Sequence, residues 1–129
     1  MNIPDNLKYS TEHEWVRIEE GNIAYVGISD HAQSELGELV YIEVDTIGEV
    51  VDKDAAFGTA EAVKTTSELF MPVTAKVLAF NPELDESEGD NPGCINEDAY
   101  ANWIVKIEIQ DMAELDTLMD AAGYGELIG

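Results

Sequence analysis

Side chains that could carry chemistry are few in this sequence, and one of them, Lys64, lies in a distinctive setting. It occurs in "AEAVKTT", between two runs with the residue types of β-strands, so we expect it at the tip of a hairpin, where another protein could reach it. Glu61 and Glu68 flank it, and nearby carboxylates favour a protonated amine, unlike the desolvated setting of a Schiff-base lysine. An amine that is displayed but is not itself a reagent indicates a modification site. The alternative is an ordinary solvated lysine on a turn.

The other reactive side chains lack the partners that catalysis or metal binding requires. His13 and His31 are far apart in the sequence, with no Cys-x-x-Cys or His-Glu-x-x-His pattern nearby, so no metal site is predicted. Cys94 follows "NPG" in an acidic segment, and such surroundings raise the pKa of a thiol instead of activating it. The glycine-rich motifs that cradle nucleotides are also missing from the sequence. We therefore expect a protein that is not an enzyme.

The composition indicates a folded, strongly acidic protein. The chain has 129 residues, the size of one domain, and 45% of them are hydrophobic, so we expect a single domain over residues 1–129. Its 6 Lys and Arg against 28 Asp and Glu give a net charge of 6 − 28 = −22, which disfavours nucleic acids and anionic membranes as partners. Two explanations of this charge stay open: attraction to basic surfaces of partner proteins, or adaptation to a salty medium.

Features of the whole chain also suggest where the protein works. A single cysteine cannot form an internal disulfide, and an unpaired thiol fits a reducing compartment. The start "MNIPDNLKYS" has neither the apolar core of a signal peptide nor the character of a transit peptide, and no apolar run approaches the roughly 20 residues of a membrane span. The expected location is the bacterial cytoplasm, or the mitochondrial matrix if this is a mature organellar chain.

Short β-strands are the main elements that the sequence predicts. "EWVRI" and "NIAYVGI" flank the connector "EEGN" and predict a hairpin, and "SDHAQSELG" predicts a short helix with Ser29 as its N-cap and Gly37 as its stop. In "ELVYIEV", residues 38–44, we expect strict alternation between the two faces of a strand. With "ELFMPV", "AKVLAF" and "NWIVKIEI", the count reaches about eight strands, as in a compact barrel or sandwich.

The C-terminal segment "DMAELDTLMDAAG" predicts a helix over about residues 111–122. Asp111 is expected to cap it, with Glu114 three residues on in an arrangement that resembles a capping box, and Gly123 is expected to end it. One face of this helix would be apolar and would dock on the sheet; it comprises Met112, Leu115, Leu118, Met119 and Ala122.

Several separated blocks of sequence resemble the H proteins of the glycine cleavage system, a family of lipoyl carriers. The blocks occur in one order and cover nearly the whole chain: "LKYSTEHEWVR", "VGISDHAQSELGELVYIEV", "AEAVKTTSEL", "INEDAY" and "NWIVKI". Val63 and Thr65 beside Lys64 differ from the methionines that flank the lysine of biotin carriers. The resemblance implies an all-β hybrid barrel-sandwich of the lipoyl- and biotinyl-carrier type, with short peripheral helices and a C-terminal helix.

The resemblance also implies a function. Lys64 would carry a covalent lipoate, and Glu61, three residues before it, would be part of what the lipoate-attaching enzyme recognises. The lipoyl arm would accept an aminomethyl group from the pyridoxal-phosphate-dependent glycine decarboxylase, present it to the tetrahydrofolate-dependent aminomethyltransferase, and be reoxidised by dihydrolipoyl dehydrogenase. The carrier is expected to be a monomer. Two alternatives stay open: a relay protein that donates lipoate to other enzymes, and a non-lipoylated interaction domain of the same fold.

The resemblance further implies that the lipoyl arm folds back against the surface of its carrier once it bears its load, the aminomethyl group. Glu14, Glu35 and Glu68 are expected to line that cleft, because a carboxylate can pair with the protonated amine of the load. The alternative is that all three are simply solvated.

Two alanines depart from the family pattern. Ala62 stands where the family often has serine, and Ala75 where it usually has glycine. If the backbone at residue 75 needs a positive φ, alanine would cost about 1 kcal/mol there.

Overall fold

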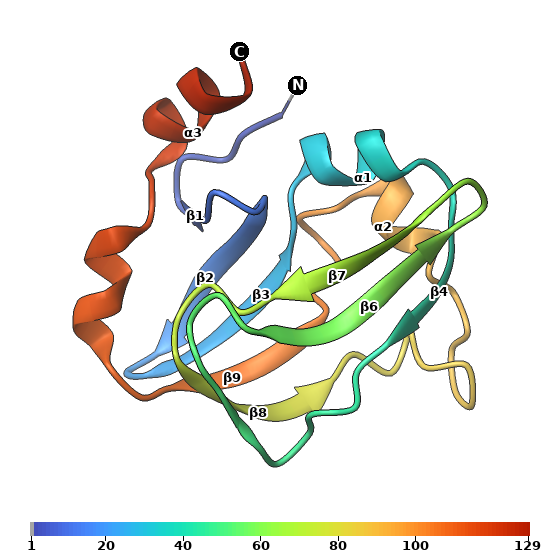
Figure 1. Ribbon diagram of the computed structural model, residues 1–129, viewed down its shortest axis with the longest axis horizontal. Coiled ribbons are helices and arrows are strands. Elements are labelled where there is room, and N and C mark those ends of the chain that lie inside the picture. The colour runs from blue at the N-terminus through green and yellow to red at the C-terminus, as the bar shows by residue number, and fades with distance from the viewer. Residues whose placement is uncertain (1) are drawn as a thin grey trace.

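The computed structural model describes residues 2–129, in which nine β-strands form two antiparallel sheets (Figure 1). The larger sheet has the strand order β1-β2-β3-β9-β8-β5, and the smaller has the order β4-β6-β7. The strands are β1 (Lys8–Tyr9), β2 (Glu14–Glu20), β3 (Ile23–Ile28), β4 (Leu39–Glu43), β5 (Val50–Val51), β6 (Ala56–Ala62), β7 (Thr66–Phe70), β8 (Ala75–Phe80) and β9 (Val105–Ile109). The prediction of a β-dominated fold with short helices is confirmed, and the two sheets pack together without closing into a barrel.

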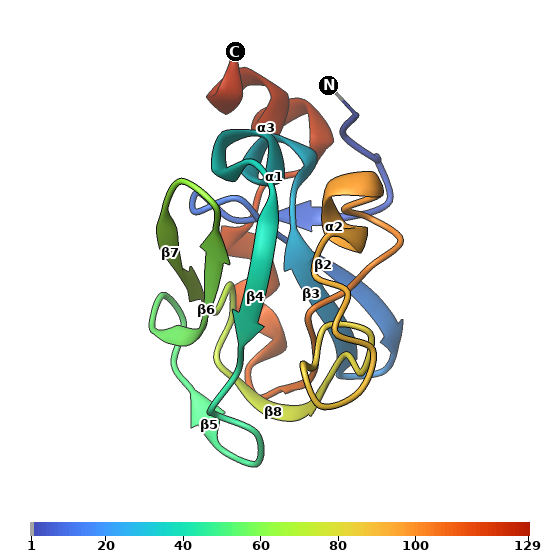
Figure 2. The same ribbon diagram turned by 90° about the vertical axis from the view of Figure 1, so that its right-hand side faces the viewer.

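The helical segments are short and lie around the sheets (Figures 1 and 2). They are α1 (Asp30–Leu36), α2 (Cys94–Glu97), the 3-10 helix η1 (Met112–Thr117) and α3 (Ala121–Ile128). α1 has the predicted caps: the Ser29 side chain accepts a hydrogen bond from the Ala32 N–H, and Gly37 ends the helix with φ of 82°. None of these helices of residues 2–129 is long and apolar enough to span a membrane.

The main hydrophobic core lies between the two sheets. Val26, Val77 and Ile107 from the larger sheet and Ile42 and Leu69 from the smaller one are all buried in it. Strand β9 alternates, with buried residues separated by the partly exposed Lys106 and Glu108. This core holds the smaller sheet, and with it the β6–β7 hairpin, against the larger one.

A second, smaller cluster covers the outer face of the larger sheet. Its buried members are Leu7, Tyr9, Trp15 and Tyr124, which come from the N-terminal segment, β1, β2 and α3. Trp15 pairs with Gly27 on β3, and a Cβ at residue 27 would lie 2.5 Å from the indole ring, so only glycine fits there. The two ends of the chain therefore pack together on this face (Figure 1).

Strand β4 departs from the predicted alternation. The pairing of β4 with β6 shifts register between Leu39 and Tyr41, which marks a β-bulge. Because the bulge adds one residue, Leu39 and Ile42 both point into the core while Val40 is 47% exposed. The prediction that residues 38–44 alternate strictly is therefore wrong.

A C-terminal helix is present, but the predicted bounds of residues 111–122 are wrong, because that segment is broken into η1 and α3. Asp111 caps η1 by accepting from the Ala113 N–H, but the backbone of Met119 then exchanges two 2.8 Å hydrogen bonds with Tyr9 and stays extended. Asp120 starts α3 as a new N-cap, so Gly123 lies inside a helix and does not end one. Of the predicted apolar face, three residues pack on the hydrophobic clusters (Leu115, Leu118 and Met119), whereas Met112 and Ala122 are exposed.

Candidate functional site

Lys64 lies in the turn between β6 and β7, as predicted. The turn is closed by a hydrogen bond from the Ala62 N–H to the Thr65 carbonyl at 2.7 Å, and the Val63 N–H donates to the Glu38 carbonyl at 3.0 Å. The second bond ties the turn to the segment that leads into β4. Lys64 is exposed at the tip, and its neighbour Val63 is 71% exposed. The hairpin therefore presents this lysine on an anchored turn.

The side chain of Lys64 lies over Gly37 at the end of α1. A Cβ at residue 37 would be 3.3 Å from Cε and 3.8 Å from Nζ of the lysine. Nζ forms no hydrogen bond or ion pair with any residue from 2 to 129. The amine is thus accessible and uncommitted, as a covalent attachment point requires, and the residues present fit an amide-linked lipoate.

A pocket of about 340 Å³ lies beside this hairpin, between β7, α1 and the turn that precedes β2. Its apolar lining is supplied by Ile28, Ala32, Leu36, Leu69 and Phe70. Its polar lining consists of Glu12, His13, Glu14, His31, Glu35, Ser67 and Glu68. The structure therefore brings Glu14, Glu35 and Glu68, which the sequence suggested for one cleft, into the same pocket.

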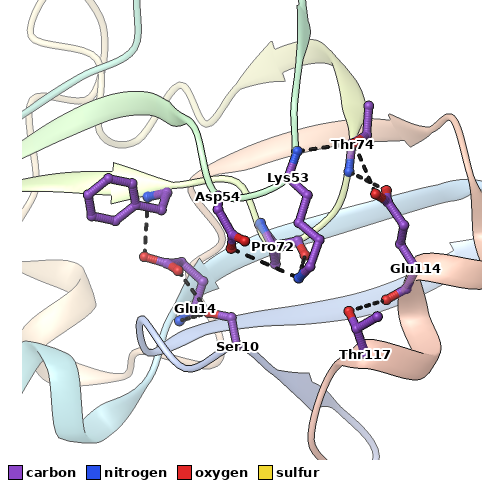
Figure 3. A network of polar contacts seen from close by, with 9 residues as sticks. Ser10, Glu14, Lys53, Asp54, Pro72, Thr74, Glu114 and Thr117 are labelled. Carbon is purple, nitrogen blue, oxygen red and sulfur yellow. Dashed lines mark hydrogen bonds and ion pairs between the residues drawn. The ribbon is translucent and has the colours of Figure 1, made fainter.

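Glu14 differs from the other carboxylates of the pocket because it is buried. It is only 2% exposed, and its carboxylate accepts from the Ser10 hydroxyl at 2.8 Å and from the Phe70 N–H at 3.4 Å (Figure 3). Burial raises the pKa of Glu14 to about 8, although these hydrogen bonds act in the opposite direction. A cation that entered the pocket would act in the same direction as these hydrogen bonds and favour the ionised form of this carboxyl.

The two histidines meet in the wall of this pocket, which sequence reasoning missed. Their ring centroids are 4.8 Å apart, and Nε2 of His31 lies 3.8 Å from the Glu35 carboxylate one turn along α1. Burial and the nearby His31 lower the pKa of His13. Within residues 2–129, no group of three or more His, Cys, Asp or Glu side chains is arranged to hold a metal ion. The helical i, i+4 spacing of His31 and Glu35 was the one sequence signal for this cluster.

Glu61 lies outside the pocket. It is an exposed residue of β6, pairs with Thr66 and Tyr41, and stands close to the Lys64 turn. A role in recognition by the lipoate-attaching enzyme stays a prediction for this residue.

The two alanine departures from the family pattern cause no backbone strain. Ala62 and Ala75 are both buried strand residues. The non-glycine residues with positive φ among residues 2–129 are His13, Asp54 and Asp90, so the strain considered for Ala75 does not arise.

Three comparisons with known proteins all match this chain to glycine cleavage H proteins. A family model described as glycine cleavage H-protein matches residues 7–129. A glycine cleavage system H protein of Bacteroides fragilis is 46% identical over 99% of this chain and 98% of its own length, and one of Brevibacillus brevis is 47% identical with the same coverage. A crystal structure of a glycine cleavage system H protein from Mycobacterium marinum has a TM-score of 0.83 at 29% identity, over 98% of this chain and 99% of that one.

Proposed function

The chain belongs to the glycine cleavage H-protein family, whose members carry lipoate, and we propose that it carries lipoate on Lys64 as the shuttle of the glycine cleavage system. The observation that carries this proposal is the uncommitted amine of Lys64 on an anchored hairpin turn. A fixed tip gives a flexible arm a defined reach and therefore a high effective concentration at a partner's active site.

The lipoyl group, when bound, supplies the sulfur chemistry that takes up and releases the aminomethyl group. The partners are glycine decarboxylase, the tetrahydrofolate-dependent aminomethyltransferase and dihydrolipoyl dehydrogenase, with a separate enzyme attaching the lipoate. This chain's own role is to display the arm and to exclude water from its load, so it is a carrier and not a catalyst. The bacterial sources of the relatives support a cytoplasmic location.

The pocket beside the hairpin is the proposed shelter for the loaded arm. Its apolar lining suits the hydrocarbon part of the arm, and its carboxylates suit a protonated amine. Glu14 is the principal partner for that amine, because its carboxylate is buried and has no cationic partner among residues 2–129. Glu35 and Glu68 line the same pocket and add negative charge around the load.

Glycine-dependent exchange of carbon dioxide tests the shuttle role. The lipoylated chain, mixed with glycine decarboxylase, should support exchange, whereas the Lys64→Arg variant should not. If the lipoylated chain supports no exchange but passes its lipoate to another enzyme, the relay alternative replaces the shuttle.

A further inference from the structure

His13, in the wall of the pocket, is held in an unusual conformation. Its φ is 74°, in the left-handed region that residues other than glycine seldom occupy. Its N–H donates to the Ser10 carbonyl at 3.1 Å, and its carbonyl accepts from the Ser29 N–H at 2.9 Å. A costly backbone conformation persists only where surrounding contacts fix it, and such residues concentrate at functional sites.

The third contact of His13 comes from the far end of the chain. Nδ1 of its ring lies 2.8 Å from the hydroxyl of Tyr124, which is on α3 and is fully buried. The same hydroxyl lies 2.6 Å from Oγ of Ser29, the N-cap of α1. Tyr124 thereby connects α3 to both the histidine and the helix that form the pocket wall, although it does not line the pocket itself.

We infer that Tyr124 is a positioning residue: its hydroxyl fixes the orientation of the His13 imidazole, and through it the wall of the pocket that shelters the arm's load. With Nδ1 engaged, the ring keeps one orientation beside Glu14. Burial raises the pKa of Tyr124 to about 12, so its hydroxyl keeps its proton and can act as donor or acceptor in this chain of contacts.

Several titratable groups face His13 and must be considered with it. His31 and Glu35 approach from α1, Glu12 and Glu14 adjoin it in the sequence, and Glu68 lies across the pocket on β7. None of them contacts Nδ1, so the effect of Tyr124 can be separated from theirs by removing one oxygen atom.

The test is the Tyr124→Phe variant, with Tyr9→Phe as the matched control. Tyr9 stacks on Tyr124 with ring centroids 4.6 Å apart, but its hydroxyl donates to the Pro4 carbonyl and not to His13. Nitrogen-15 NMR of the unmodified chain would measure the pKa and tautomer of His13; only two histidines need to be assigned. A protonated ring must donate from Nδ1 to the Tyr124 hydroxyl, and this charge-assisted hydrogen bond is stronger than the one that a neutral ring forms. Tyr124→Phe removes the hydrogen bond and should therefore lower the pKa of His13 by roughly one half to one pH unit.

The second measurement is the lifetime of the load on the lipoylated chain, followed as release of ammonia. Tyr124→Phe should shorten it by roughly two- to tenfold, the effect of losing one hydrogen bond, while Tyr9→Phe should match the wild type. The inference is overturned if the pKa and tautomer of His13 are unchanged in Tyr124→Phe, or if they change and the lifetime does not. A wild-type ring that samples both tautomers equally would contradict it without any variant.

Only the lifetime measurement rests on the proposed function. If the aminomethyl group lasted no longer on the wild-type chain than on a lipoylated peptide, the proposal that the pocket shelters the loaded arm would be contradicted. The NMR result would still decide whether Tyr124 positions His13.

Discussion

Glu14 shows how a single residue sets the chemistry of the pocket. Its carboxyl is buried and receives hydrogen bonds from Ser10 and Phe70 without a cationic partner among residues 2–129. Sequence reasoning could choose this residue, because the family resemblance covers "EHEW". It could not separate Glu14 from the other acids nearby, because burial depends on how distant segments pack.

Replacing Glu14 with Gln should change how stability depends on pH. The pKa of Glu14 is raised from 4.5 to about 8, so between these values the unfolded chain has released a proton that the folded chain keeps. This contribution to stability is fully present below about pH 4.5 and is lost as the pH rises to about 8. Glu14→Gln should therefore lose less stability than the wild type as the pH rises through this range.

Urea unfolding across this pH range measures the effect. Glu12→Gln is the matched control, since Glu12 lines the same pocket but is exposed. Equal slopes of the free energy of unfolding in the wild type and Glu14→Gln would contradict the burial argument.

At the scale of elements, the sequence predicted contacts between residues that are close together in the chain, but not contacts between residues that are far apart in it. The β2–β3 hairpin and the caps of α1 follow from residues next to one another. The break between η1 and α3 depends on the backbone pairing of Met119 with Tyr9, more than a hundred residues away. The same holds for the β4 bulge, and for His13 and His31, which meet only once β2 and α1 are packed.

The 3-10 helix η1 is attached to the larger sheet through Glu114. Its carboxylate accepts from the Thr74 N–H at 2.7 Å and from the Thr74 hydroxyl at 3.2 Å, and does not close a capping box with Asp111 (Figure 3). Glu114→Ala should lower the free energy of unfolding by roughly 1 to 3 kcal/mol, because Thr74 loses a charged acceptor.

Asp116→Ala is the control for that change. It removes the same charge from the same helix, but Asp116 is exposed and its side chain has no hydrogen bond within residues 2–129. Its effect should stay within about 0.5 kcal/mol. Equal losses in the two variants, measured by chemical denaturation, would refute the role of the Thr74 contact.

At the scale of the whole molecule, the fold class could be inferred from the pattern of short strands, whereas the sheet order could not. β3 pairs with β9, and β5 pairs with β8. Such neighbours are set by the shared core and not by local sequence. Charge is the other property of the whole molecule: residues 2–129 contain two ion pairs between a lysine and a carboxylate, besides the contact of His31 with Glu35, so most of the 28 carboxylates have no cationic partner.

If the net charge of −22 steers the protein to its partners, association should weaken steeply with salt. The binding of the lipoylated chain to glycine decarboxylase, measured from low to high ionic strength, checks this. An affinity that stays flat would favour adaptation to a salty medium as the reason for the charge.

The central claim is that Lys64 is the attachment site of lipoate, and intact mass spectrometry tests it most directly. After co-expression with a lipoate ligase, the wild-type chain should gain the mass of one lipoyl group, and Lys64→Arg should gain none. Lys53→Arg and Lys76→Arg should both be modified like the wild type, since these lysines lie away from the β6–β7 turn. No increment on the wild type, or an increment that survives Lys64→Arg, would contradict the account.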